Sequence, residues 1–147
     1  MYKKKYTIYL ADDDNEDREF FQEVVEEINS RIDLKTFRNG VDLMDGLTAT
    51  SKLPNCIFLD LNMPLMDGEE CLSSIRNSVR LKKVPVVIYS TSIDISNAER
   101  LRDLGANLYL KKPNTFNGLK IAISNCLKHI KENPATKDDG SSFIVQL

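Results

Sequence analysis

The chain has few cysteines, almost no net charge and no long hydrophobic run, and each shortage excludes a class of protein. Its three cysteines, Cys56, Cys71 and Cys126, are odd in number, widely separated and without a CxxC pair. Neither a disulfide framework nor a zinc site is indicated, and we expect reduced, packed thiols. The 20 Lys and Arg against 22 Asp and Glu leave a net charge of -2, which gives no general attraction for nucleic acid or anionic lipid. The function must therefore reside in a local site.

Apolar targeting and membrane segments are also missing. The N-terminal lysines are not followed by an apolar signal region before Asp12, and no run approaches the roughly 20 apolar residues of a membrane span. These absences predict a soluble cytoplasmic protein. Its 147 residues are enough for one domain that folds without disulfides. The one histidine, His129, is expected at a surface or half-buried position, with no role as a phosphoryl donor.

Segments rich in β-branched and aromatic residues alternate with segments of helical period, which is typical of a parallel sheet with crossover helices. Asp14 suits the start of the first helix, and Gly105 suits the end of the fourth. Strands are predicted at about 6–11, 32–37, 56–60, 86–89 and 107–111, and helices at about 15–29, 41–47, 69–79, 97–104 and 115–132.

The end of the chain differs from the rest. We assign 1–133 to the α/β domain and 134–147 to a C-terminal tail that is polar and then briefly apolar. The tail is too short for a second domain. We expect it to be flexible and unstructured unless its apolar end, 143–147, docks on the domain.

Charged residues follow three of the predicted strands: Asp12 and Asp13 the first, Asp60 the third and Lys112 the fifth. The carboxyl ends of parallel strands share one edge of a sheet, where α/β proteins keep their sites. Carboxylates ~4 Å apart repel by about 4 kcal/mol at a surface-like dielectric, so such a cluster keeps a proton or holds a cation. We expect Mg²⁺, bound by the three aspartates and the backbone carbonyl of Asn62.

The same edge predicts phosphoryl transfer. A bound cation reduces the repulsion between carboxylates and an incoming phosphoryl group, so Asp60 can attack in line and become phosphorylated. Lys112 supplies an ammonium and Ser90, at the end of the fourth strand, a hydroxyl for the phosphoryl oxygens. Taken singly, each of these residues is more typical of a solvated helix start or an ordinary strand end than of a site. Their convergence favours a site with Asp60, Lys112 and Ser90 as its catalytic residues.

Four segments resemble the receiver domain of two-component response regulators. They are ADDD (11–14), LDLNMPLMDG (59–68), VIYSTS (87–92) and YLKKP (109–113). Ser90 and Lys112, which follow Asp60 by 30 and 52 residues, also match the family spacing. The resemblance covers about residues 5–132. It implies a flavodoxin-like, doubly wound five-stranded parallel sheet of order 2-1-3-4-5 with five helices.

The resemblance also implies roles for single residues. Ser90 and Tyr109 would form the switch, and Asn62 and Ser92 would tune autodephosphorylation. Thr91 stands where many relatives have a small residue, and it narrows the space into which Tyr109 would turn.

The peptide bond between Lys112 and Pro113 falls where the family has a cis bond, and we predict that it is cis. By the same resemblance, Asp60 is the phosphoacceptor and the aspartates with Asn62 hold Mg²⁺.

The implied partner is a sensor histidine kinase or a histidine phosphotransfer protein, whose phosphohistidine would be the donor. The chain would be a signalling phosphoacceptor, with self-catalysed phosphotransfer and autodephosphorylation, rather than an enzyme. Phosphorylation would alter the face made by the fourth helix, fifth strand and fifth helix, for partner binding, phosphorelay or homodimerisation. Because the chain ends soon after the last helix, we expect a stand-alone receiver that binds neither DNA nor a membrane.

Three other functions fit parts of the pattern. A haloacid dehalogenase-type phosphatase also uses a strand-end Asp with Mg²⁺, but its second acid would stand where this chain has Asn62, so the proton donor is missing. In a flavin-binding flavodoxin, the DDDN sequence (12–15) would repel the ligand phosphate. An interaction module that is never phosphorylated would not need the full set of site residues.

Overall fold

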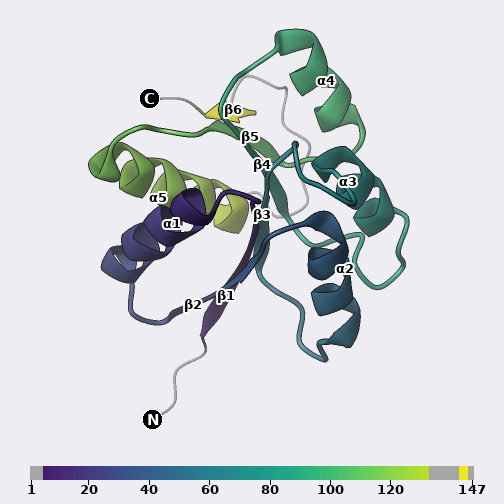
Figure 1. The fold of residues 1–147 in the computed structure, drawn as a ribbon, viewed down its shortest axis with the longest axis horizontal. Helices are drawn as coiled ribbons and strands as arrows, with labels where there is room; N and C mark the ends of the chain where they lie inside the picture. The colour runs from purple at the N-terminus through teal and green to yellow at the C-terminus, as the bar shows by residue number, and fades with distance from the viewer. Residues whose placement is uncertain (1–4, 133–142, 146–147) are drawn as a thin grey trace.

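The computed structural model describes residues 5–132 and 143–145, which form a parallel sheet between two layers of helices (Figure 1). Helices α1 (Asn15–Ile28) and α5 (Phe116–Glu132) cover one face. Helices α2 (Gly40–Ala49), α3 (Gly68–Arg76) and α4 (Ile95–Asp103) cover the other. The strands are β1 (Tyr6–Ala11), β2 (Ile32–Phe37), β3 (Cys56–Leu59), β4 (Val86–Ser90), β5 (Leu108–Lys111) and β6 (Ile144–Val145).

The strand order is β2-β1-β3-β4-β5-β6, and every neighbouring pair is parallel. The predicted five-strand order is confirmed and is extended by the two residues of β6. Within the described residues no helix is long and apolar enough to cross a bilayer.

Two hydrophobic cores form because both faces of the sheet are covered. Strands β3 and β4 are buried along their whole length, as is usual for the central strands of parallel sheets. Alternate side chains enter opposite cores: Ile57 and Leu59 pack towards α2, α3 and α4, and Phe58 packs towards α1 and α5. The three cysteines are buried and free, which confirms the prediction of packed thiols.

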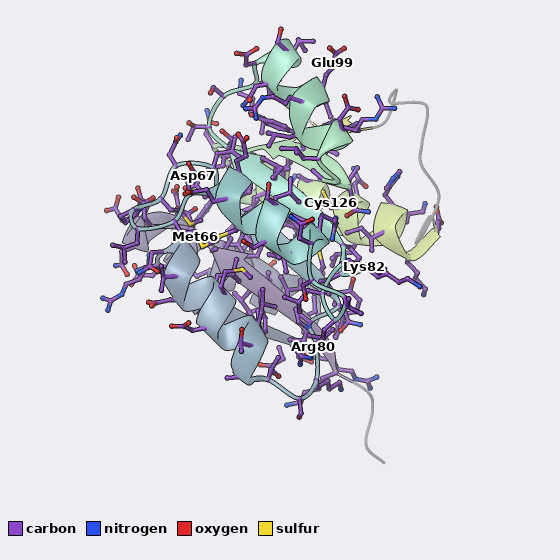
Figure 2. All side chains as sticks on the ribbon, turned by 90° about the vertical axis from the view of Figure 1, so that its right-hand side faces the viewer. Met66, Asp67, Arg80, Lys82, Glu99 and Cys126 are labelled. Atoms are coloured by element: carbon purple, nitrogen blue, oxygen red, sulfur yellow. The ribbon has the colours of Figure 1, made fainter. Side chains whose placement is uncertain are left out.

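Helix starts follow local capping rules. The Asp14 side chain accepts hydrogen bonds from the backbone N–H groups of Glu16 and Asp17 and so begins α1. Asp67 and Glu70 form a reciprocal capping box at the start of α3. Asp67 and its neighbour Met66 lie where the loop after β3 enters this helix (Figure 2).

The loop between β3 and α3 folds closely back on the end of β3. The Gly68 N–H donates to the Leu61 carbonyl at 2.9 Å. A Cβ atom at Gly68 would lie 2.2 Å from the Asp60 carbonyl oxygen, so only glycine allows this approach. The end of the sequence LDLNMPLMDG thus returns to the two residues that follow β3, Asp60 and Leu61.

The structure revises one prediction and resolves an alternative in another. The tail was expected to be unstructured unless its apolar end docks on the domain, and within that end Phe143 is buried and Ile144–Val145 pair with β5. The remainder of the predicted tail, 134–142 and 146–147, lies outside the described residues. The predicted cis bond before Pro113 is wrong, since all peptide bonds in the described ranges are trans. Proline only weakens the trans preference to about 0.5–1 kcal/mol, and from the trans backbone Lys112 already reaches the carboxylates.

Candidate functional site

Strand register brings the predicted site residues to one edge of the sheet. Ala11 pairs with Leu59, so Asp12 and Asp60 follow their strands at the same level. Ser90 pairs with Lys111, so Lys112 stands one position beyond Ser90. The Lys112 N–H donates to the Ser90 carbonyl at 2.7 Å and joins the two strand ends. The predicted convergence is confirmed.

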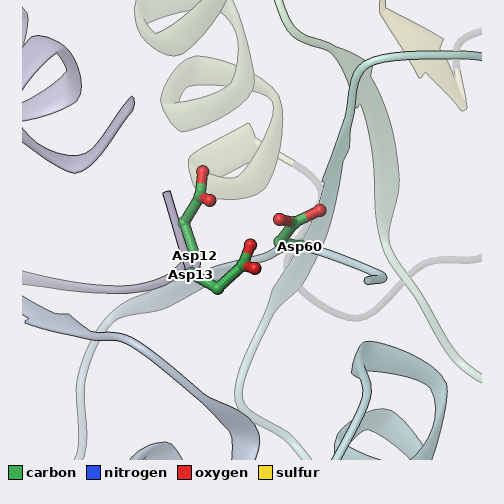
Figure 3. A group of neighbouring side chains, drawn as sticks. All are labelled: Asp12, Asp13 and Asp60. Atoms are coloured by element: carbon green, nitrogen blue, oxygen red, sulfur yellow. The ribbon is translucent and has the colours of Figure 1, made fainter. Parts of the chain in front are cut away.

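Three carboxylates gather at this edge, as Figure 3 shows for Asp12, Asp13 and Asp60. One oxygen from each lies within 4.8 Å of the others. Asp12 and Asp60 are buried, whereas Asp13 is exposed. Three hard oxygen donors at this separation, open to solvent on one side, fit a divalent cation that keeps several of its waters.

The ammonium of Lys112 completes the cluster. Its Nζ lies 2.9 Å from Asp12 Oδ2, 2.9 Å from Asp17 Oδ2 and 3.6 Å from Asp60 Oδ2. The Tyr89 ring lies 5.0 Å from the same atom and offers its negative face. Burial lowers the pKa of Lys112, but the hydrogen bonds to Asp12 and Asp17, together with the charges of Asp60 and Asp12, outweigh it and raise the pKa overall. Lys112 is therefore charged at neutral pH.

Asp60 has the most unusual environment of the acidic residues. Burial raises its pKa from 3.8 to about 7, and the adjacent Asp12 contributes through its charge and a hydrogen bond. The charge of Lys112 and the backbone N–H of Asn62 oppose this rise in pKa. A second positive charge near Asp60 would favour its ionised form. The site is thus electrostatically prepared for a cation.

Ser90 and Tyr109 surround the same edge. Ser90 is buried at the end of β4, and its Oγ accepts a hydrogen bond from the Ser92 N–H at 3.5 Å. The Tyr109 ring is buried, and its hydroxyl donates to the Ser92 carbonyl at 2.9 Å. Thr91, which was expected to narrow the space for Tyr109, is exposed.

Two residues at the site were not singled out from the sequence. Asp17 lies in the first turn of α1, where the local sequence indicates only a solvated acidic residue at the start of a helix. Tyr89 reads as an ordinary core residue of β4. Asp17 could have been found from its position in the first turn of the helix, five residues after Asp12. A side chain at that position can point back towards the end of the strand. Asn62 and Ser92, predicted from the resemblance, are exposed at this end of the sheet.

The family model of the response regulator receiver domain matches residues 8–124, most of the chain. The chain belongs to the response regulator receiver family. Receiver domains of this family are signalling phosphoacceptors that take phosphoryl groups from histidine kinases, and they bind divalent metal. This membership favours the receiver over the haloacid dehalogenase-type alternative.

Individual relatives agree with the family match. The chain is 33% identical to response regulator Rcp1 of Synechocystis sp. over 117 residues, which is 76% of this chain and 80% of Rcp1. The phosphorylated cyanobacterial phytochrome response regulator RcpA superposes with a TM-score of 0.77 at 30% identity, over 90% of this chain and 98% of RcpA. The Mn²⁺-bound form of Rcp1 gives a TM-score of 0.73 at 29% identity, over 90% of this chain and 99% of Rcp1.

Proposed function

We propose that this receiver accepts a phosphoryl group on Asp60 from the phosphohistidine of a sensor histidine kinase or a histidine phosphotransfer protein. The observation that carries the proposal is the placement of Asp60 beside the two carboxylates that follow β1, with the Lys112 ammonium 3.6 Å away. This arrangement combines a nucleophilic oxygen with groups able to offset the charge of an approaching phosphoryl group.

Mg²⁺ is the proposed cofactor, held by Asp12, Asp13, Asp60 and the backbone carbonyl of Asn62. When bound, the ion neutralises carboxylate charge and polarises the phosphoryl group. The donor set supports it, because these are oxygen ligands of the kind that Mg²⁺ prefers. The Mn²⁺-bound Rcp1 structure supports a divalent ion in a related protein.

In the transfer, an oxygen of ionised Asp60 attacks phosphorus in line. The new O–P bond forms as the P–N bond of the donor breaks, and the bonding electron pair goes to the imidazole nitrogen. Lys112 then exchanges its bond with Asp12 for one with a phosphoryl oxygen. The Ser90 hydroxyl donates to another oxygen.

We propose that Asn62 and Ser92 tune how quickly water removes the phosphoryl group from Asp60. Both are exposed at this end of the sheet, where their side chains can order or exclude an attacking water. This autodephosphorylation and the phosphotransfer are properties of the receiver itself rather than turnover of an independent substrate.

The output is proposed to use Ser90 and Tyr109. Ser90 would draw the loop after β4 towards the phosphoryl group, and the inward Tyr109 would hold that loop through its bond to Ser92. The changed face of α4, β5 and α5 would bind a partner, relay the phosphoryl group or form a homodimer. Action as a stand-alone protein, a cytoplasmic location, and the absence of direct DNA or membrane binding remain predictions.

The test is incubation with acetyl phosphate and Mg²⁺, followed by intact mass measurement. We expect a single phosphoryl adduct on the native chain, none on Asp60→Asn, and none on the native chain in EDTA. Asp45→Asn, which changes an exposed aspartate of α2, is the matched control and should still be phosphorylated. An equal adduct on the native chain and on Asp60→Asn would refute the acceptor assignment.

A further inference from the structure

We infer that the outer edge of β5 is a docking site for the chain's own C-terminal segment, Phe143–Val145, and that this docking and phosphorylation favour each other. The docking stands on contacts that the structure shows. The coupling rests on the proposed function, because it needs Asp60 to be the phosphoacceptor.

The docked segment forms both backbone and side-chain contacts. Tyr109 pairs with Ile144 and Leu110 with Val145 in parallel register. The Tyr109 N–H donates to the Phe143 carbonyl at 2.8 Å. Phe143 is 5% exposed and belongs to the core beneath α2, α3 and α4, and its ring meets the Tyr109 ring edge-on at 6.4 Å.

These contacts cover an edge that would otherwise be open. Without β6, β5 would end the sheet and present unpaired N–H and C=O groups to a partner. Figure 1 shows β6 on the outer side of β5, between the layers that contain α4 and α5. An extended segment added to a sheet edge gains backbone hydrogen bonds and lodges alternate side chains on the two faces. Here Ile144 packs on one core and Val145 on the other.

Tyr109 links the docked segment to the phosphoryl site. Its backbone and ring contact Phe143, while its hydroxyl bonds to Ser92, whose N–H bonds in turn to Ser90 Oγ. Phe143 packs against the buried Tyr109 ring and bonds to its backbone, so the docked segment stabilises the ring in this buried position. Docking therefore selects the inward Tyr109, which holds the loop next to Ser90.

Coupling between two equilibria of one molecule is reciprocal. If docking stabilises the phosphorylated chain more than the unphosphorylated chain, then phosphorylation strengthens docking. Removing the segment should weaken phosphorylation, although the side-chain partners of Lys112 are Asp12, Asp17 and Asp60 and not residues of this segment. The occupant is the same chain, since the structure seats the segment on its own β5.

The experiment compares three variants with the native chain: a truncation after Ser142, Phe143→Ala, and Ile121→Ala as a control. Ile121 is an exposed apolar residue of α5, so its replacement tests the loss of an apolar side chain away from β5. Amide hydrogen exchange of Tyr109, followed by NMR, reports docking directly. The acetyl phosphate concentration for half-maximal adduct reports the coupling, and light scattering after size exclusion reports the oligomeric state.

We expect Tyr109 amide exchange to be at least about 10-fold faster in the truncated chain and intermediate in Phe143→Ala. Half-maximal phosphorylation should require about 5-fold more acetyl phosphate or more after truncation, the lower end of ordinary coupling. Ile121→Ala should match the native chain in both measurements. Phosphorylation of the native chain should slow Tyr109 exchange further.

Distinct outcomes would overturn each part. Equal Tyr109 exchange in native and truncated chains would overturn docking, and equal phosphorylation curves would overturn the coupling. If light scattering showed a dimer and the Tyr109 amide lost its protection from exchange on dilution, the segment on β5 would come from a second copy of the chain. That result would overturn docking within one chain. The absence of a phosphoryl adduct on the native chain and on all variants would refute the proposed function, and the coupling with it. Amide hydrogen exchange of Tyr109 would still show whether the segment docks.

Discussion

The Nζ atom of Lys112 lies 2.9 Å from a carboxylate oxygen of Asp17, the same distance that separates it from Asp12. Asp17 belongs to the first turn of α1, so a helix as well as the strand ends positions the lysine. If a cation were bound at Asp12, the ammonium would keep Asp17 as a partner. The proposed metal site could then hold two positive charges without leaving Lys112 unpaired.

Asp17→Asn should weaken divalent metal binding by about 3- to 10-fold, or roughly 1 kcal/mol. Without Asp17 the ammonium competes more strongly for Asp12 and Asp60, and one negative charge near the site is lost. Mn²⁺ titration followed by electron paramagnetic resonance measures the affinity. Glu16→Gln, on the same helical turn, is the control for charge alone. Equal weakening in both variants would show that the Asp17 contact with Lys112 has no specific effect.

Ser90→Ala should slow phosphorylation by acetyl phosphate about 10-fold or more, because a hydrogen bond to a charged group contributes roughly 1.5–3 kcal/mol. Ser90→Thr keeps the hydroxyl and should remain within a few-fold of the native rate. The rate of adduct formation by intact mass distinguishes the two variants. Equal rates for Ser90→Ala and the native chain would remove Ser90 from the proposed phosphoryl contacts.

Asp60→Asn should alter the pH dependence of stability. The pKa of Asp60 is about 7 in the folded chain, against 3.8 as its ordinary value. Between these values the folded state holds a proton that the unfolded state has released, so native stability falls as pH rises from about 4 to 7 and then levels. The full effect corresponds to at most about 4 kcal/mol.

Asp60→Asn lacks this titration, so it should be more stable than the native chain at pH 8 and nearly equal at pH 4. Urea unfolding in EDTA at both pH values measures the difference, with Asp45→Asn as the control that keeps the native pH profile. Asp60→Asn being less stable than the native chain at pH 8 would contradict the electrostatic account.

Gly68→Ala should destabilise the chain by about 2–3 kcal/mol and weaken Mn²⁺ binding. The new Cβ would lie 2.2 Å from the Asp60 carbonyl oxygen, so the loop must move away from the site. Gly118→Ala, in α5, should instead be neutral or stabilising by up to about 1 kcal/mol. Urea unfolding and Mn²⁺ titration test both variants, and an unperturbed Gly68→Ala would show that the close approach is not required.

Much of the fold could be predicted because its signals are local. The apolar runs that end at Asp12, Asp60 and Ser90 are short, and parallel strands must present their carboxyl ends together. Helix boundaries were less accurate: α4 begins at Ile95, two residues before the predicted start, because Asp94 caps it. The proposed roles of the site residues themselves stay predictions.

Other features depend on distant parts of the chain. The trans bond before Pro113 differs from expectation, and the short β6 corresponds to the docked alternative that the sequence left open. The local sequence of 143–147, a brief apolar stretch after a polar tail, is typical of a frayed chain end. Its docking depends on the open edge of β5 and the Tyr109 ring, which no pattern within 143–145 describes.

The sequence by itself determines the alternation of strands and helices, because apolar periodicity and chain connectivity allow few other arrangements. This alternation also determines the sheet edge at which the aspartates, Ser90 and Lys112 lie. Pairings across long stretches of chain need the folded coordinates. Lys112 contacts Asp12 and Asp17, which lie 100 and 95 residues earlier in the chain. Phe143 contacts Tyr109 through a backbone hydrogen bond at the sheet edge and through ring packing in the core. Such contacts depend on distances of a few ångströms between separate elements, which residue types and spacing do not specify.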